Sequence, residues 1–177
     1  MNIRRFAGKT PQLGERVLVD SSAVVLGDVE LGDDCSVWPA TVIRGDMHRI
    51  RIGARTSVQD GSGLHITHAG PFNPDGYPLI IGEDVTIGHK VLLHGCTIGS
   101  RILIGMGSIV MDGAVIEDEV VLGAGSLVPA NKTLRSGYMY MGSPAREVRP
   151  LSEKERSFFT YTAGNYVRLK DQYLQEG

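Results

Sequence analysis

The sequence predicts a mainly β protein, a parallel β-helix of stacked triangular coils, because aliphatic residues recur along it at six-residue intervals. Neither an amphipathic helix nor an alternating strand keeps a six-residue period over such a length. Glycine often follows the periodic residue, and a small or β-branched residue tends to stand four places after it. This pattern is typical of the hexapeptide repeat of β-helices. The periodic residues are Val19, Val25, Leu31, Val37, Ile43, Ile52, Val58, Leu64, Ile81, Ile87, Ile98, Ile104, Val110, Ile116, Leu122, Val128 and Leu134.

We expect the repeats over residues 15–143, within a single domain of 177 residues that starts with a lead-in segment at 1–14. A helix is expected over 151–175, because Ser152 and Glu155 match a capping box at its start. The apolar spacing after this box is helical. The helix should cover one side of the β-helix through a face formed by Phe158, Thr162, Tyr166, Leu169 and Tyr173.

The composition argues against nucleic-acid binding, membrane insertion and secretion. The net charge of −2 provides no basic surface for nucleic acid. No segment approaches the roughly 18 apolar residues of a membrane span, and the N-terminus lacks the apolar run of a secretory signal. Cys35 and Cys96 are the only cysteines, so free thiols in a reducing cytoplasm are expected. We therefore expect a cytoplasmic protein that binds neither nucleic acid nor membrane.

The six-residue period is interrupted three times, and most of the histidines lie at these breaks. The interval 43–52 is nine residues and indicates a three-residue insertion. The interval 64–81 is seventeen residues and contains a segment rich in Gly, Pro, Asn and Asp, which predicts a loop that leaves the coil at a corner. The interval 87–98 is eleven residues, so one repeat is a residue short. Long loops in compact domains are often functional.

Counting repeats from these breaks places Arg44, His65 and His94 in one column on an outer edge of three successive coils. The same count places Asp60 beside His89 on a different face. Two histidines one coil apart, about 4.8 Å at the backbone, can converge on one metal ion. His89 lies five residues before His94, a span on the order of 16 Å of extended chain. We therefore predict that His89 completes the site of a neighbouring subunit in a threefold ring.

Three motifs resemble those of the gamma-class carbonic anhydrases of the hexapeptide-repeat superfamily, and the match covers nearly the whole chain. They are I-R-G-D at 43–46, V-Q-D-G at 58–61 with Leu-His shortly after it, and G-H-x-x-x-x-H-G at 88–95. The resemblance implies a left-handed β-helix and a homotrimer. It also implies reversible hydration of CO₂ to bicarbonate by a metal-bound hydroxide at the trimer interface. The metal would be Zn²⁺, or else Fe²⁺ or Co²⁺, and its ligands would be His65, His89 and His94.

The resemblance also implies roles for the polar residues of these motifs. Arg44 and Asp46 match an interfacial ion pair that positions the site. Gln59 matches a residue that hydrogen-bonds the hydroxide or the incoming substrate. Asp60 would orient the ring of His89 or of its neighbour. A purely structural role for the Arg44–Asp46 pair remains an equal alternative.

The sequence departs from the most active archetype where that protein carries glutamates that help to move the proton. Met47 and His68 stand at those places, which argues against fast turnover. A histidine can relay protons near neutral pH, so His68 is a candidate proton shuttle, although an ordinary exposed histidine would suit its loop equally well. Tyr140, in a Y-M-G-S-P segment, is a further candidate that would reach the site late in the chain.

Two other functions remain open at this stage. One is a trimeric scaffold that holds a metal ion without catalysing a reaction, which the missing glutamates favour modestly. The other is a hexapeptide acyltransferase that uses acyl-CoA, because the same fold hosts such enzymes and fold does not determine function. An acyltransferase needs one histidine as a base, which would make the metal-like spacing of three histidines a coincidence.

Overall fold

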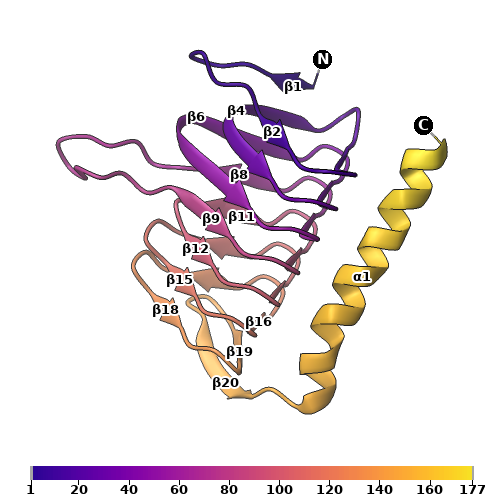
Figure 1. Cartoon of the computed structure of the whole chain (residues 1–177). Coiled ribbons are helices and arrows are strands. Elements are labelled where there is room, and N and C mark those ends of the chain that lie inside the picture. Colours follow the sequence, from indigo (N-terminus) through magenta and orange to yellow (C-terminus); the bar gives the residue numbers. More distant parts are fainter. Residues whose placement is uncertain (1, 177) are drawn as a thin grey trace.

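The computed structural model describes residues 2–176 and confirms a left-handed parallel β-helix with a single C-terminal helix beside it (Figure 1). Aliphatic side chains from every coil fill the interior in one continuous core. Each coil contributes short strands that pair with the coils before and after it, so the backbone hydrogen bonds run along the axis of the solenoid. No helix within residues 2–176 is both long and apolar enough to cross a membrane.

The larger sheet has twelve strands and forms two sides of the triangular prism, because β4 and β6 continue through a corner without a break. All of its pairings are parallel. Its strands are β1 (Ile3–Arg4), β2 (Gln12–Leu13), β4 (Val24–Leu31), β6 (Val42–Ile52), β8 (Gly63–His65), β9 (Leu79–Ile81), β11 (Leu92–His94), β12 (Thr97–Ile98), β14 (Ile109–Val110), β15 (Val115–Ile116), β17 (Leu127–Val128) and β18 (Thr133–Leu134).

The smaller sheet has eight strands and forms the third side of the prism. It is parallel except at its end, where β20 turns back against β19. Its strands are β3 (Leu18–Val19), β5 (Ser36–Val37), β7 (Ser57–Val58), β10 (Thr86–Ile87), β13 (Leu103–Ile104), β16 (Val121–Leu122), β19 (Tyr138–Met141) and β20 (Arg146–Pro150).

The register between coils agrees with the repeat count from the sequence. Leu64 pairs with Ile43 on one side and with Leu93 on the other, and Val58 pairs with Ile87. All five side chains are almost fully buried, which is the expected result for the inward position of each repeat. Because the periodic aliphatic residue of each repeat faces inward, this register also decides which polar residues meet on the outside.

The segment expected as a lead-in already contributes to the larger sheet within its described residues, 2–14. Its strands β1 and β2 pair with β4 in parallel and extend the first coil. The six-residue rhythm in fact reaches β2, because Leu13, followed by Gly14, stands six residues before Val19, whereas β1 has no residue in this rhythm.

The two long breaks in the period have different structures. The insertion within 43–52 stays inside β6, which accommodates it through a register irregularity against β4. The longer insertion leaves the prism after β8 and returns at β9, and it extends away from the coils as a loop (Figure 1). An antiparallel bridge between Thr67 and Tyr77 closes the base of this loop.

The C-terminal helix α1 (Glu153–Glu176) begins at the predicted capping box. The Ser152 hydroxyl accepts a hydrogen bond from the Glu155 backbone N–H at 3.3 Å, and the Glu155 carboxylate accepts one from the Ser152 backbone N–H at 2.9 Å. The helix runs along the smaller sheet and contacts β3, β5 and β10 (Figure 1). It therefore covers one side of the prism, as expected.

The predicted buried face of α1 is partly wrong: Thr162, Tyr166 and Leu169 are half-buried, but the most deeply buried positions differ from those predicted. The buried side chains are Phe159, Ala163 and Lys170, whereas Phe158 is 46% exposed and Tyr173 is 50% exposed. The reason is that a charged residue occupies a core position, which a reading based on apolar spacing rejects. The helix rotates so that Lys170 faces the sheet.

Two interactions fix this rotation. The Lys170 ammonium is fully buried and lies 3.0 Å from a carboxylate oxygen of Asp34, whose other partner is Arg16. Trp38, on the covered sheet, packs edge-on against Tyr166 and Tyr173 with ring centroids 6.1 and 5.1 Å apart. An ion pair and an aromatic cluster therefore attach α1 to the coils together.

Candidate metal centre

Two of the three predicted ligands, His65 and His94, meet on one edge of the prism. They end β8 and β11, and the register of these strands pairs them directly. His65 Nδ1 lies 3.1 Å from His94 Nε2, and the ring centroids are 5.1 Å apart. The two side chains meet because adjacent coils stack at the strand spacing and present the same position of the repeat outward.

Each of these rings is held by a carboxylate on its other nitrogen. Asp46 Oδ1 lies 3.0 Å from His65 Nε2, and Asp112 Oδ1 lies 2.6 Å from His94 Nδ1. A carboxylate at neutral pH only accepts hydrogen bonds, so the nitrogen facing it carries the proton. In neutral rings, the two nitrogens that face each other are therefore lone-pair acceptors.

The surroundings of His65 favour the neutral form of its ring. Burial lowers the pKa of His65, and the hydrogen bond to Asp46 offsets this only in part. Burial alone would raise the pKa of Asp46, but hydrogen bonds from His65 and Arg44 outweigh it and hold the pKa below its ordinary value. Arg44 lies 2.5 Å from the second oxygen of Asp46, so this ion pair, which was expected between subunits, forms within one chain.

This arrangement fits a divalent cation. Two lone pairs 3.1 Å apart repel each other unless a positive charge lies between them. Two Zn–N bonds of about 2.0–2.1 Å at a tetrahedral angle place their nitrogens about 3.3 Å apart, close to the observed separation. A carboxylate behind each imidazole is also the usual support for a metal-binding histidine.

The third predicted ligand, His89, lies at a different corner, after β10 in the smaller sheet. Its Nδ1 lies 2.7 Å from Asp60 Oδ2, as the repeat count predicted, and both side chains are 47% exposed. The adjacent Gln59 is buried and hydrogen-bonds Tyr166 of α1. Burial raises the pKa of Tyr166, the Gln59 hydrogen bond opposes this, and the charge of Asp60 adds to the rise.

The candidate site is therefore divided into two halves within one chain. The first half contains His65 and His94 with their carboxylates, and the second half contains His89 with Asp60. Within residues 2–176 of a single chain, no three His, Cys, Asp or Glu side chains come together closely enough to hold a metal ion.

Other predicted residues lie outside both halves. Tyr140 is buried in the last coil, where its hydroxyl accepts a hydrogen bond from the Arg135 backbone N–H at 2.9 Å and lies near Glu147. It pairs in register with Leu122 and lies three coils beyond β10, so within one chain it is remote from the three histidines. His68 is exposed in the loop after β8, close to His65 in sequence.

Repeat counting from the sequence missed two residues of the first half, Asp112 and Thr67. Asp112 follows β14 on the coil beyond His94, and the Thr67 hydroxyl donates to its second oxygen at 2.8 Å. The same count that aligned the histidines would have placed Asp112 next to Gly95. The breaks in the period give no signal for Asp112, because it lies in a regular stretch of repeats.

An exposed apolar column lies on the same side of the prism as the first half. Val42, Leu92 and Ile109 occupy the outward position of successive strands and are 37–44% exposed, with Gly63 between the first two. Half-buried Leu127 continues the column. The smaller sheet has its outer face covered by α1, whereas this face is uncovered in the single chain.

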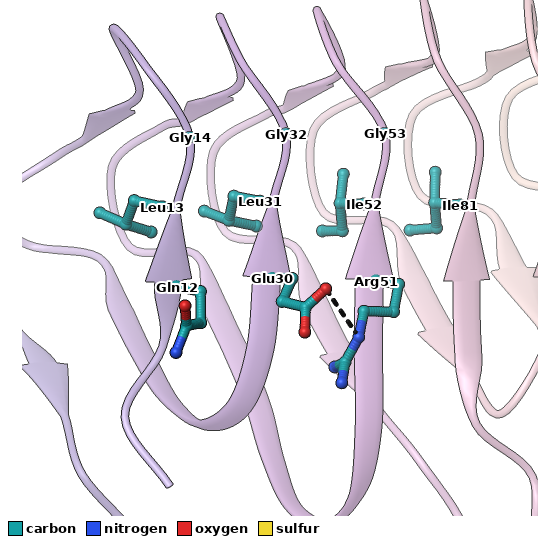
Figure 2. Close-up of a pocket in the computed structure, with 10 residues that line it drawn as sticks. All are labelled: Gln12, Leu13, Gly14, Glu30, Leu31, Gly32, Arg51, Ile52, Gly53 and Ile81. Carbon is teal, nitrogen blue, oxygen red and sulfur yellow. Dashed lines mark ion pairs between the residues drawn. The ribbon is translucent and has the colours of Figure 1, made fainter.

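A groove of about 460 Å³ lies elsewhere, along β2, β4, β6 and β9, and none of the predicted site residues lines it (Figure 2). A row of aliphatic side chains lies along it, namely Leu13, Leu31, Ile52 and Ile81 (Figure 2). Glu30 and Arg51 form an ion pair at its rim, 3.1 Å apart. It offers no group that matches the chemistry of the histidine pair.

Comparison with known proteins agrees with this class of fold. The family model for bacterial transferase hexapeptide repeats (six repeats) matches residues 10–45. Protein YrdA of Escherichia coli is 60% identical over 99% of this chain and 95% of its own length. A solved structure of a candidate acetyltransferase from Bacillus cereus has a TM-score of 0.92 at 37% identity, over 99% of this chain and 98% of that one.

Two further relatives carry the name carbonic anhydrase. Gamma carbonic anhydrase 1, mitochondrial, of Arabidopsis thaliana is 39% identical over 95% of this chain, which spans 61% of that protein. The carbonic anhydrase of Geobacillus kaustophilus is 38% identical over 97% of this chain and 87% of its own length. The chain therefore belongs to the hexapeptide-repeat family and is similar within it to the gamma carbonic anhydrases.

Proposed function

We propose that the protein is a metal-dependent carbonic anhydrase, which hydrates CO₂ reversibly to bicarbonate at sites between the subunits of a homotrimer. The observation that carries this proposal is the pair of facing nitrogens on His65 and His94, each backed by a carboxylate. The relatives named carbonic anhydrase support the reaction class.

The division of the site supports assembly around a threefold axis. His65 and His94 lie on one sheet and His89 lies after a strand of the other, so a closed ring brings the first half of each chain to the second half of its neighbour. The apolar column of Val42, Leu92 and Ile109 supplies an uncovered surface for this contact. Three equivalent sites would result.

In this assembly, His65 and His94 together with His89 of the partner subunit would hold Zn²⁺, or else Fe²⁺ or Co²⁺. When bound, such a cation acts as a Lewis acid and lowers the pKa of water to about 7. The three imidazoles are held in place by Asp46, Asp112 and Asp60. Neutral ligands leave the charge of the cation uncompensated, which favours this chemistry.

The remaining polar residues have supporting tasks in this proposal. Gln59 is buried against Tyr166, so we assign it to holding the Asp60 corner beneath α1, and contact with substrate requires its amide to turn outward. His68 is exposed beside the first half and would pass protons to solvent. Met47 is exposed and carries no proton, so we expect slower turnover than with a glutamate there.

The proposal is tested by metal analysis of anaerobically purified protein together with stopped-flow CO₂ hydration. We expect one metal ion per chain in a trimer, loss of both metal and activity in His94→Ala, and unchanged metal content in His48→Ala. His48 is a suitable control because it binds only the backbone, at Asp75 O and Arg49 N. A metal-loaded trimer with no rate above buffer would leave the non-catalytic scaffold as the function.

An acyltransferase is a second candidate, favoured by the similarity to the candidate acetyltransferase from Bacillus cereus. Such an enzyme needs an imidazole with a free nitrogen to act as base. The second nitrogens of His65 and His94 face each other, which disfavours that role for either residue. Calorimetry with acetyl-CoA separates the two functions, since only an acyltransferase should bind it at micromolar concentration.

A further inference from the structure

Asp112 uses both of its carboxylate oxygens next to the histidine pair. Oδ1 lies 2.6 Å from His94 Nδ1, and Oδ2 accepts a hydrogen bond from the Thr67 hydroxyl at 2.8 Å. The side chain is mostly buried, with 30% of its surface exposed. Thr67 thus fixes the carboxylate, and the carboxylate in turn faces one nitrogen of His94.

We propose that Asp112, held by Thr67, is the positioning residue of His94: it keeps the ring in the tautomer with the proton on Nδ1 and directs Nε2 toward His65. This inference rests on the proposed metal site, because Nε2 is the nitrogen that would bind the cation. Without an acceptor at Nδ1, either nitrogen of a neutral imidazole can carry the proton. Nε2 would then be protonated, and unable to bind metal, in part of the molecules.

The backbone around His94 is adapted to this contact. Gly95 has φ +51°, and a Cβ at this position would lie 2.3 Å from Asp112 Oδ1 and 2.6 Å from the Cβ of Tyr77. The Gly113 N–H donates to the Gly95 carbonyl at 2.8 Å and holds the two coils together at this point. Only glycine beside His94 leaves room for the carboxylate.

The base of the loop after β8 is part of the same arrangement. Thr67 and Tyr77 exchange two backbone hydrogen bonds, of 3.1 and 2.8 Å, which close the loop. Tyr77 lies over Gly95 and Gly113, where an added Cβ would meet it at 2.6 and 3.0 Å. The closed base therefore places the Thr67 hydroxyl on Asp112, so the loop contributes to the orientation of His94 from outside the coils.

The experiment measures two quantities, the tautomer of the His94 ring and the affinity of the protein for zinc. In metal-free protein, imidazole ¹⁵N shifts should show His94 with its proton on Nδ1 in the wild type and as a mixture of tautomers in Asp112→Ala. Zinc affinity from chelator competition should fall about 10–100-fold in Asp112→Ala. Thr67→Val should weaken it about threefold through the loss of one hydrogen bond, and Thr67→Ser, which keeps the hydroxyl, should restore it.

Controls separate positioning from stability. Asp118→Asn makes the same charge change on an exposed aspartate that pairs with Arg101, so it should alter neither the tautomer nor zinc affinity. If Asp112→Ala does not fold, Asp112→Asn can replace it, because an amide oxygen still accepts from Nδ1. That variant should retain the tautomer but bind zinc several-fold more weakly.

The inference is overturned if His94 keeps the wild-type tautomer and zinc affinity in Asp112→Ala, or if Thr67→Ser is as weak as Thr67→Val. Its failure can be distinguished from failure of the proposed function. If the wild-type protein binds zinc but does not hydrate CO₂, the ¹⁵N and affinity measurements still decide the role of Asp112. If it binds no zinc at all, the proposed function fails, and the tautomer measurement alone decides the orientation of the ring.

Discussion

At the scale of single residues, each histidine of the proposed metal site is oriented by a neighbouring carboxylate. His65, His94 and His89 each have one nitrogen against a carboxylate, from Asp46, Asp112 and Asp60 in turn. A carboxylate at this position fixes the rotation of the ring and increases the basicity of the opposite nitrogen. Changes to these aspartates should therefore affect metal binding although none of them is a proposed ligand.

Asp46→Asn is the first prediction at this scale. The amide keeps its volume but loses the charge that pairs with Arg44 and accepts from His65. We expect zinc affinity to fall about 10–100-fold, measured by competition with a chelator. Asp75→Asn, an exposed aspartate in the loop whose backbone carbonyl alone contacts His48, is the matched control and should bind zinc like the wild type. Equal affinities in the two variants would contradict the role of Asp46.

At the scale of elements, the attachment of α1 to the coils depends on a buried ion pair. The Lys170 ammonium is fully buried and paired with Asp34 and with Asp171. Removing one partner from a buried ion pair leaves an uncompensated charge, which costs more than the pair itself contributes. This is why the helix holds a rotation that its apolar spacing does not predict.

The ion pairs of Asp34 make the stability of the protein depend on pH in the acidic range. Hydrogen bonds and charge from Arg16 and Lys170 outweigh burial and hold the pKa of Asp34 at about 2, below its ordinary value of 3.8. A depressed pKa adds stability that is present above pH 4 and is lost as the pH falls toward 2. We expect this contribution to be about 1–2 kcal/mol after allowance for solvent screening.

Urea unfolding from pH 5 to pH 2 measures this contribution. Asp34→Asn should be less stable than the wild type at pH 5, and the difference should shrink as the pH approaches 2. Asp33→Asn, the exposed neighbour in the same turn, controls for the loss of one charge. A difference that stays constant over this range would show that Asp34 is not the group that titrates.

At the scale of the whole molecule, the solenoid separates residues that are close in sequence and joins residues that are distant. His89 and His94 are five residues apart, but His89 follows a strand of the smaller sheet and His94 ends a strand of the larger one, whereas His65 and His94 are 29 residues apart and in contact. A site of three histidines then needs two chains. The proposed trimer makes that requirement testable without a structure of the assembly.

Subunit complementation is the corresponding prediction. His89→Ala and His94→Ala should each bind no zinc as pure trimers, because every site lacks one ligand. After the two variants are unfolded together and refolded at equal amounts, an intact first half from one chain can meet an intact second half from the other. Random assembly should restore roughly one quarter of the sites, measured as zinc bound per chain. A mixture that binds no zinc, although it forms mixed trimers by native mass spectrometry, would rule out sites shared between neighbouring chains.

Much of the fold could be predicted because a β-helix repeats one short sequence pattern in every coil. Each coil contacts mainly its neighbours, so the period of the aliphatic residues sets both the architecture and the register. This is why the contact of Asp60 with His89 and the alignment of His65 with His94 follow from counting. The strand β1 could not be counted, because it joins the sheet without the repeat, whereas Leu13 of β2 keeps the six-residue spacing.

The sequence by itself determined the β-helix, its coil register, the capped helix and the pairing of two histidines, because these depend on side chains within one repeat or one coil of each other. Only the tertiary structure decided the rotation of α1, the remote position of Tyr140, and the contacts of Asp112 with His94 and of Thr67 with Asp112. Those features depend on where a buried charge finds its partner and where a loop returns to the coils. Such contacts join distant segments and have no period in the sequence that would reveal them.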